Sequence, residues 1–295
     1  PGNATLRAYQ GPAGSLGATY VNTFESRFFR SLLYEADRVP GIQPFVSYNT
    51  GALPSGGPAR TLNVSRAFGE AGLKVINTGG TNLVSPAPIG PSWSNAELHL
   101  AMENNFSVWI DQPGWRTWLL EAQLHDYGSG LLGIMFDQAG NQRQGCAVFH
   151  AGIGGASDQQ QRLQLYTYVH EIGHCFNLLH SWQKSYANPP VPNRPASLSW
   201  MNYPWNSVFG TPANFWNNFA FQFDDEEVVH LRHAYRNNVI MGGSDFTVGS
   251  GAGHSHADLS EFQDPEEDRS GLDFRIETRP SYAYGEPVVV DLRLS

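Results

Sequence analysis

The sequence lacks the features of a membrane or nucleic-acid-binding protein. No apolar run approaches the length of about 20 residues that a membrane-spanning helix needs. Lys and Arg together number 18 against 27 acidic residues, and they are scattered rather than gathered into a basic stripe. Nucleic-acid binding depends on concentrated positive charge. We therefore expect no membrane span and no nucleic-acid partner.

Cysteine and charged residues are also scarce. The 2 cysteines, Cys146 and Cys175, exclude a disulfide framework and leave two alternatives, a single bridge or two packed thiols. Charged residues make up only 15% of the chain, whereas Gly and Pro number 31 and 19. This composition predicts long, well-packed loops around a modest set of regular elements.

A secretory leader is missing as well, because the sequence begins without a charged and then apolar segment. Three N-x-S/T triplets, starting at Asn3, Asn63 and Asn105, give a faint indication of a secretory route. We expect a soluble protein that is secreted or extracellular, with no signal peptide in this chain.

The stretch YVHEIGHCFNLLH, residues 168–180, carries the clearest chemical signal. His170, Glu171 and His174 form an H-E-x-x-H motif. Residues four apart in an α-helix share one face, so both imidazoles can bind one zinc ion. Glu171 lies beside them, in the position of the general base of zinc hydrolases.

A third histidine, His180, follows six residues after His174. A continuous helix would carry His180 too far along its axis to share the metal, so the chain must turn sharply. Asparagine adopts the left-handed conformation that ends helices better than most residues do. Asn177 stands where this turn is needed.

With these residues, the chain resembles the metzincin clan of zinc endopeptidases, whose signature is H-E-x-x-H-x-x-G-x-x-H followed by a methionine-bearing turn. Here the turn is Ser199-Trp200-Met201-Asn202-Tyr203. Asn177 replaces the usual Gly, as in some pappalysin-like members. Ser181 after the third His is shared with matrixins. The Tyr two places after the Met is similar to astacins, serralysins and pappalysin-like enzymes, so the subfamily stays open.

The resemblance implies one catalytic Zn²⁺ held by His170, His174 and His180. It also implies that Met201 forms an apolar floor beneath the imidazoles. By resemblance to astacins, Tyr203 ligates zinc at rest and then binds the oxyanion. A calcium ion has no support beyond an acidic segment, residues 258–268, which reads equally as a linker.

The expected fold class is α+β: a zincin domain with a mixed twisted sheet, an active-site helix and a C-terminal helix, followed by a short β segment. We expect a catalytic domain over residues 1–257, with an upper part to residue 176 and a lower part from 177. Residues 258–295 then form an acidic linker and strands that begin an immunoglobulin-like module or dock as a hairpin. Helices are predicted over 20–37, 65–72, 92–104, 113–125, 158–176 and 224–236. Strands are predicted over 5–9, 42–48, 73–76, 131–136, 146–149, 272–276 and 288–294.

Several segments near the motif have two interpretations. By resemblance, residues 131–136 form an exposed edge strand that binds substrate, and the alternative is an internal strand. Aromatic residues after the Met turn either line a substrate pocket or form core: Trp205, Phe209, Phe215, Trp216, Phe219, Phe221 and Phe223. His230 and His233, three apart on a helix, are more often solvated or hydrogen-bonded than metal ligands, as are His254 and His256 in their loop.

The function expected from the sequence is zinc-dependent endoproteolysis of proteins or glycoproteins, with Glu171 as general base. One alternative is a zinc-containing module that binds peptide or glycan without hydrolysis. Another is a zinc amidase for a non-peptide substrate. The intact Glu171 argues against the binding module. The sequence does not indicate an oligomeric state.

Overall fold

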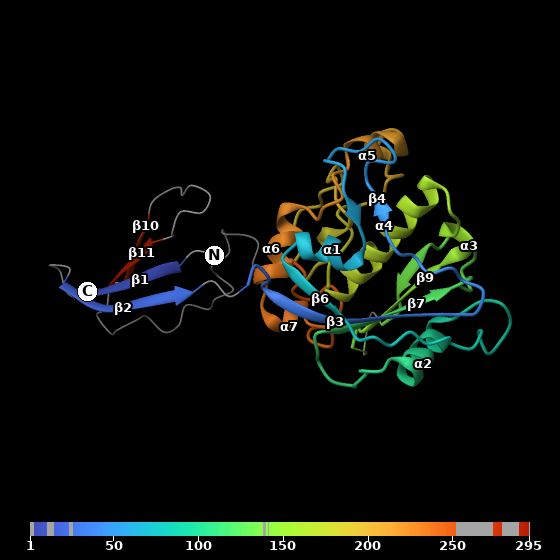
Figure 1. Ribbon diagram of the computed structural model, residues 1–295, viewed down its shortest axis with the longest axis horizontal. Coiled ribbons are helices and arrows are strands. Elements are labelled where there is room, and N and C mark those ends of the chain that lie inside the picture. The colour runs from blue at the N-terminus through green and yellow to red at the C-terminus, as the bar shows by residue number, and fades with distance from the viewer. Residues whose placement is uncertain are drawn as a thin grey trace. The chain divides into compact units, whose positions relative to one another are not determined.

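The computed structural model describes residues 3–10, 15–23, 26–137, 140, 142–251, 274–278 and 289–294. The chain divides into two units, one of residues 28–255 and one that combines residues 1–27 with 256–295. The second unit is a four-stranded sheet in the order β10-β11-β1-β2 (Figure 1). Its strands are β1 (Asn3–Gln10), β2 (Ser15–Thr23), β10 (Phe274–Thr278) and β11 (Val289–Leu294).

This division differs from the expected boundary at residue 257. The antiparallel pair β10–β11 matches the two strands predicted near the C-terminus, but β11 also pairs in parallel with β1, with Thr5 opposite Val289. The first strand therefore belongs with the last ones. The acidic segment 258–268, His254 and His256 lie outside the described residues.

The larger unit is of mixed α and β structure and is organised by a five-stranded sheet in the order β6-β3-β7-β9-β8. Four strands are parallel, and the edge strand β8 is antiparallel to β9. Their bounds are β3 (Arg30–Arg38), β6 (Leu73–Asn77), β7 (Arg116–Ala122), β8 (Gly133–Met135) and β9 (Gly145–Phe149). The short strands β4 (Tyr48–Asn49) and β5 (Thr61–Leu62) pair separately.

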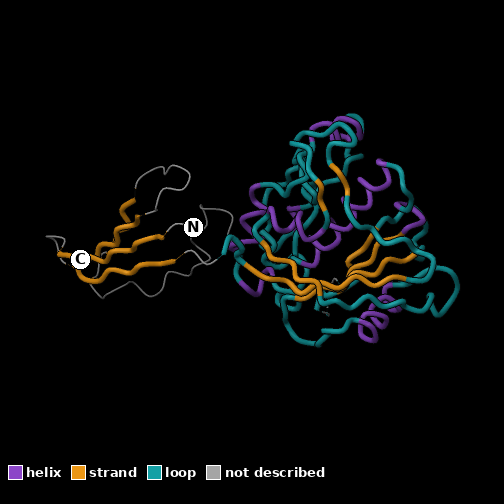
Figure 2. Tube along the Cα trace, viewed as in Figure 1, coloured by secondary structure: helices purple, strands orange, loops and turns teal. Residues whose placement is uncertain are grey.

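Helices cover both faces of the sheet (Figures 1 and 2). One face packs on α2 (Asn95–Asn105), and the other packs on α4 (Asp158–Cys175) and α1 (Val64–Glu70). The side chains of strand β7 alternate between the two faces of the sheet. Trp118, Leu120 and Ala122 belong to the core cluster with α2, whereas Leu119 belongs to the cluster with α4. The remaining helices are α3 (His150–Ile153), α5 (Pro212–Asn218), α6 (Asp225–His233) and α7 (Arg236–Val239), with 3-10 turns at Lys184–Tyr186 and Ser207–Phe209.

Two predicted helices are strands in the structure. The segment 113–125 contains β7, and the segment 20–37 contains parts of β2 and β3. In β7 the buried residues Trp118 to Ala122 are continuous because helices cover both faces of the sheet. A strand buried on both faces has no polar alternation, so its apolar residues coincide with a helical spacing by accident. The predicted strand 42–48 is loop, except that β4 begins at Tyr48.

The helices and strands around the histidine motif are confirmed: α1 followed by β6, then α2, β8, β9, α4 and α6. The Ser157 side chain caps α4 in a capping box with Gln160, so the cap falls one residue before the expected Asp158. Among the residues that the structure describes, no helix is both long enough and apolar enough to cross a bilayer.

Candidate metal centre

Helix α4 presents two of the three histidines. His170 and His174 lie one turn apart near its C-terminal end, and the helix ends at Cys175. Asn177 follows in the left-handed region, with φ 66°. The predicted turn is thus present, and it redirects the chain so that His180 returns to the same point.

The Asn177 side chain does more than permit a positive φ. Its Nδ2 donates to the carbonyl oxygens of Asn238 and Val248, each at 2.8 Å, and its Oδ1 accepts from the Thr247 N–H at 2.8 Å. Asn177 is fully buried. A glycine would allow the turn but would leave these three backbone groups without this partner, which gives a physical reason for asparagine here.

The three imidazoles converge through their Nε2 atoms. The distances are 3.2 Å between His170 and His174, 3.2 Å between His174 and His180, and 3.1 Å between His170 and His180. Tetrahedral coordination at a Zn–N distance of about 2.0–2.1 Å places two ligand nitrogens about 3.3 Å apart. The observed spacing therefore fits one zinc-sized ion.

Hydrogen bonds fix the tautomers in the way that a metal site requires. The Nδ1 of His170 lies 2.7 Å from the Trp200 carbonyl oxygen, and that of His174 lies 2.7 Å from the Leu178 carbonyl oxygen. The Nδ1 of His180 contacts Oε1 of Gln183. Because these oxygens only accept, each Nδ1 carries the proton and each Nε2 presents a lone pair. Three lone pairs that face one another could hold a metal ion between them.

Burial makes the protonated imidazoles unfavourable. It lowers the pKa of His170 to about 3, and the pKa values of His174 and His180 are also lowered, chiefly by burial. Neutral imidazole is the form that binds metal. Among the described residues, these three are the grouping of His, Cys, Asp and Glu side chains that could hold a metal ion.

Glu171 lies beside the triad and faces the edge strand. Its carboxylate accepts a hydrogen bond from the Met135 backbone, and burial raises its pKa well above the usual range. Gly133 of β8 makes room for it, because a Cβ on this glycine would lie 2.5 Å from the Glu171 Cγ. The strand and the carboxylate are thus in direct contact.

Met201 is fully buried, in the core cluster that also contains Val169 and Ile172 of α4. A Cβ on Gly173 would lie 2.5 Å from the Met201 sulfur, so the turn packs directly on α4 between the two metal-binding positions. The Ser181 N–H donates to the Met201 carbonyl oxygen at 2.9 Å, which joins the turn to the residue after His180.

Tyr203 faces the site from the end of the same turn. Its ring centroid lies 4.5 Å from that of His180 and 5.7 Å from that of His170, and Trp205 stacks on it at 5.0 Å. Burial and the negative charge of Glu171 raise the pKa of Tyr203. The phenol therefore stays protonated at neutral pH and can donate a hydrogen bond near Glu171.

Two clefts meet at Glu171 and Tyr203. One, of ≈ 400 Å³, is lined by His174, His180, Phe246 and Tyr186, among others, and the second, of ≈ 230 Å³, by His170, Thr167 and Trp205. Both share Leu131 and Gly133. Strand β8 occupies the sheet edge, as predicted, so the internal-strand alternative is wrong. The aromatic residues divide: Trp205 lines a cleft, whereas Phe215, Phe219 and Phe221 are core.

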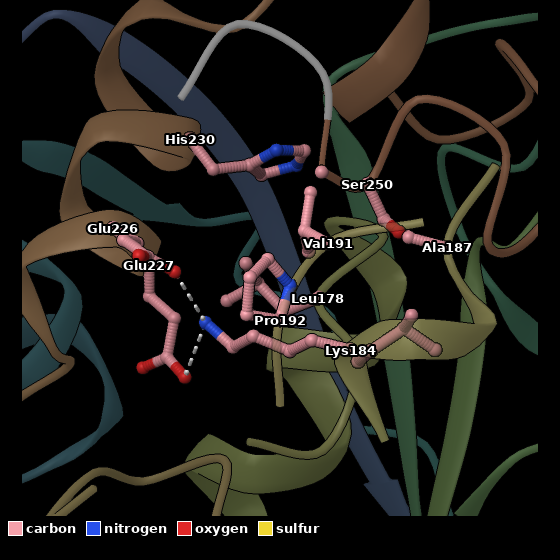
Figure 3. Close-up of a pocket in the computed structure, with 11 residues that line it drawn as sticks. Leu178, Lys184, Ala187, Val191, Pro192, Glu226, Glu227, His230 and Ser250 are labelled. Atoms are coloured by element: carbon pink, nitrogen blue, oxygen red, sulfur yellow. Dashed lines mark ion pairs between the residues drawn. The ribbon is translucent and has the colours of Figure 1, made fainter. Parts of the chain in front are cut away.

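A buried ionic network supports the segments around the site, and the sequence did not reveal it. Glu227 of α6 accepts hydrogen bonds from Ser199 Oγ and, at 3.2 Å, from Ser181 Oγ. Figure 3 shows the Lys184 ammonium between the carboxylates of Glu226 and Glu227, at 3.5 and 3.6 Å. Burial raises the pKa of Glu227 to about 7. Glu227 thus connects the residue after His180 and the first residue of the Met turn to α6.

The other histidines and the cysteines that the sequence singled out have structural roles. His230 Nε2 donates to the Phe176 carbonyl oxygen at 2.9 Å, and the ring of His233 packs edge-on against Phe29, so these two do not form a metal site. Cys146 and Cys175 are buried free thiols, which decides against the bridge.

Comparison of the chain with protein-family models, with curated proteins and with solved structures gave no match.

Proposed function

We propose that this protein is a zinc-dependent endopeptidase of the metzincin type, acting on proteins or glycoproteins. The observation that carries the proposal is the convergence of three Nε2 atoms within 3.2 Å of one another, next to a buried carboxylate and a free strand edge. Three imidazoles leave a coordination position open, which is the arrangement of catalytic rather than structural zinc sites.

His170, His174 and His180 would hold the zinc ion, which would supply a Lewis acid for the substrate carbonyl and lower the pKa of a bound water toward about 7. Glu171 is placed to accept the proton of the attacking water and to pass it to the leaving amine. Burial raises its pKa above the usual range, which makes the carboxylate a stronger proton acceptor. Tyr203 is placed to donate a hydrogen bond to the oxyanion of the tetrahedral intermediate.

The position of strand β8 at the sheet edge favours an extended polypeptide as the substrate. Among the described residues β8 pairs with β9 alone, and its residues Gly133, Ile134 and Met135 line the larger cleft. A peptide chain can add to such an edge through backbone hydrogen bonds, which brings a peptide bond next to Glu171. A small non-peptide amide would not need this edge.

The test is the Glu171→Ala variant, assayed with casein and with a mucin-type glycoprotein, with Glu103→Ala on α2 as the control. We expect Glu171→Ala to keep one zinc per chain by elemental analysis and to lose cleavage by at least about 100-fold, because a general base contributes about that factor. Glu103→Ala should cleave as the wild type does. A Glu171→Ala variant that cleaves at the wild-type rate would refute the assignment of the base.

A further inference from the structure

A separate cavity of ≈ 560 Å³ lies where three neighbouring parallel strands end. Its lining comes from residues 41–47 after β3, Gln123 after β7, His150 and residues 154–156 after β9, and Gln161 and Gln164 of α4. Ligands commonly bind outside the carboxyl ends of parallel strands, where the connecting loops meet. The volume falls within the range of about 300–1,000 Å³ typical of small-molecule sites.

The cavity is distinct from the metal centre. It shares no lining residue with either cleft beside the histidines. Gln164 precedes His170 by six positions in α4, which is about 9 Å along the helix axis. A ligand here would therefore not touch Glu171.

The lining combines polar and apolar side chains and contains no charged one. Four carboxamide side chains contribute, those of Gln43, Gln123, Gln161 and Gln164, together with Ser47. None of the described residues around the cavity is Lys, Arg, Asp or Glu. A carboxamide carries two donors and an acceptor, and hydroxyl groups also donate and accept, so such a lining matches a ligand rich in hydroxyls. Gln164 contributes its Oε1 alone, because its Nε2 already donates to two backbone carbonyl oxygens. A charged ligand would find no counter-charge, and an apolar one would leave the amides unpaired.

Hydrogen bonds hold this lining in place. His150 Nε2 lies 3.3 Å from the Tyr168 hydroxyl, which donates to Glu121 at 2.9 Å. Gln164 Nε2 donates to the carbonyl oxygens of Ile153 and Gly155, at 3.1 and 2.8 Å. Hydrogen bonds thus hold His150 and the buried Gln164 in place, whereas Gln43 and Gln123 are exposed at the rim. Burial lowers the pKa of His150 to about 4, so this lining residue is neutral as well.

We propose that this cavity binds an uncharged saccharide unit. A peptide fits less well, because β3, β7 and β9 each have a strand on both sides and offer no free edge for backbone pairing. Phe45 lines the cavity and provides an apolar surface for the face of a sugar ring. The site goes beyond the proposed hydrolysis and does not depend on it.

The experiment titrates the full-length protein with N-acetyl-D-glucosamine, N-acetyl-D-galactosamine, D-mannose and D-galactose, detected by saturation-transfer NMR and calorimetry. D-glucose 6-phosphate serves as the charged comparison. The test variants are Gln123→Ala and Gln161→Ala, both at positions that are not fully buried. The matched control is Gln159→Ala, an exposed glutamine of the same helix that does not line the cavity.

We expect at least one neutral sugar to bind more tightly than the charged one. Each test variant should weaken it about two- to tenfold, the effect of one lost hydrogen bond, while Gln159→Ala leaves it unchanged. Glu171→Ala should bind it as the wild type does, so a failure of the proposed hydrolysis would leave this result intact. No binding of any neutral probe, or binding that the two test variants do not weaken, would overturn the proposal.

Discussion

Replacing Asn177 by glycine tests the account of the turn between the metal-binding positions. If only backbone conformation mattered, Asn177→Gly would be neutral or stabilising, because glycine adopts a positive φ freely. In the structure, however, the Asn177 side chain makes three hydrogen bonds of 2.8 Å to the backbone of residues 238, 247 and 248. Backbone conformation alone predicts no loss of stability in Asn177→Gly, whereas the loss of the three hydrogen bonds predicts a lower free energy of unfolding.

The magnitude follows from these bonds. Each buried hydrogen bond contributes about 1 kcal/mol net, so the three together contribute about 3 kcal/mol. Glycine has no strain in the left-handed conformation, which restores at most about 1 kcal/mol of the free energy of unfolding. We therefore expect Asn177→Gly to lower the free energy of unfolding by about 2–3 kcal/mol, or Tm by about 4–12 °C for a unit of this size.

The assay is thermal and urea-induced unfolding, with and without saturating zinc, followed by circular dichroism. Asn177→Ala is the companion variant: it loses the same bonds and keeps the strain of a positive φ, so it should be less stable than Asn177→Gly by about 1 kcal/mol. Unfolding of Asn177→Gly at the wild-type temperature would refute the reasoning, because the side-chain bonds would then contribute nothing.

Further predictions concern the carboxylates and the metal. Gly133→Ala should reduce kcat while zinc content stays unchanged, because its Cβ would displace the Glu171 side chain; unchanged kcat by steady-state proteolysis would contradict this contact. Burial raises the pKa of Glu121 to about 7 from its usual 4.5, so its carboxyl group stays protonated to a higher pH in the folded state than in the unfolded state. Its contribution to stability is thus complete below pH 4.5 and is lost as pH rises through 7, amounting to about 3 kcal/mol at most. Glu121→Gln should therefore flatten the stability profile measured by urea unfolding from pH 5 to pH 8, and a slope equal to that of the wild type would count against the shift. Removing zinc with a chelator should lower Tm by scanning calorimetry, since an ion at 1,000 times its Kd stabilises by about 4 kcal/mol; no change would argue against the site.

The local parts of the site could be predicted from the sequence. The spacing of His170 and His174 fixes their common helix face, and the conformational preference of asparagine indicates the turn at Asn177. Residue 133 could not be placed against Glu171 without the strand order. The hydrogen bonds of Asn177 and of Glu227 reach 61 to 71 and 28 to 46 residues away, and no local pattern indicates such partners.

The fold was predicted less well than the site, for two physical reasons. The strand β7 is buried on both faces, and its sequence RTWLLEA therefore lacks the alternation that distinguishes a strand from a helix. The pairing of β1 with β11 joins residues 5 and 289, and a parallel contact over this separation leaves no local trace in the sequence.

The central claim is that His170, His174 and His180 hold one zinc ion, and zinc K-edge absorption spectroscopy of the purified protein tests it most directly. The proposal predicts about one zinc per chain with three imidazole nitrogens at about 2.0–2.1 Å and oxygen in the remaining position. Sulfur scattering at about 2.3 Å, or zinc that persists at full occupancy in His174→Ala, would contradict it.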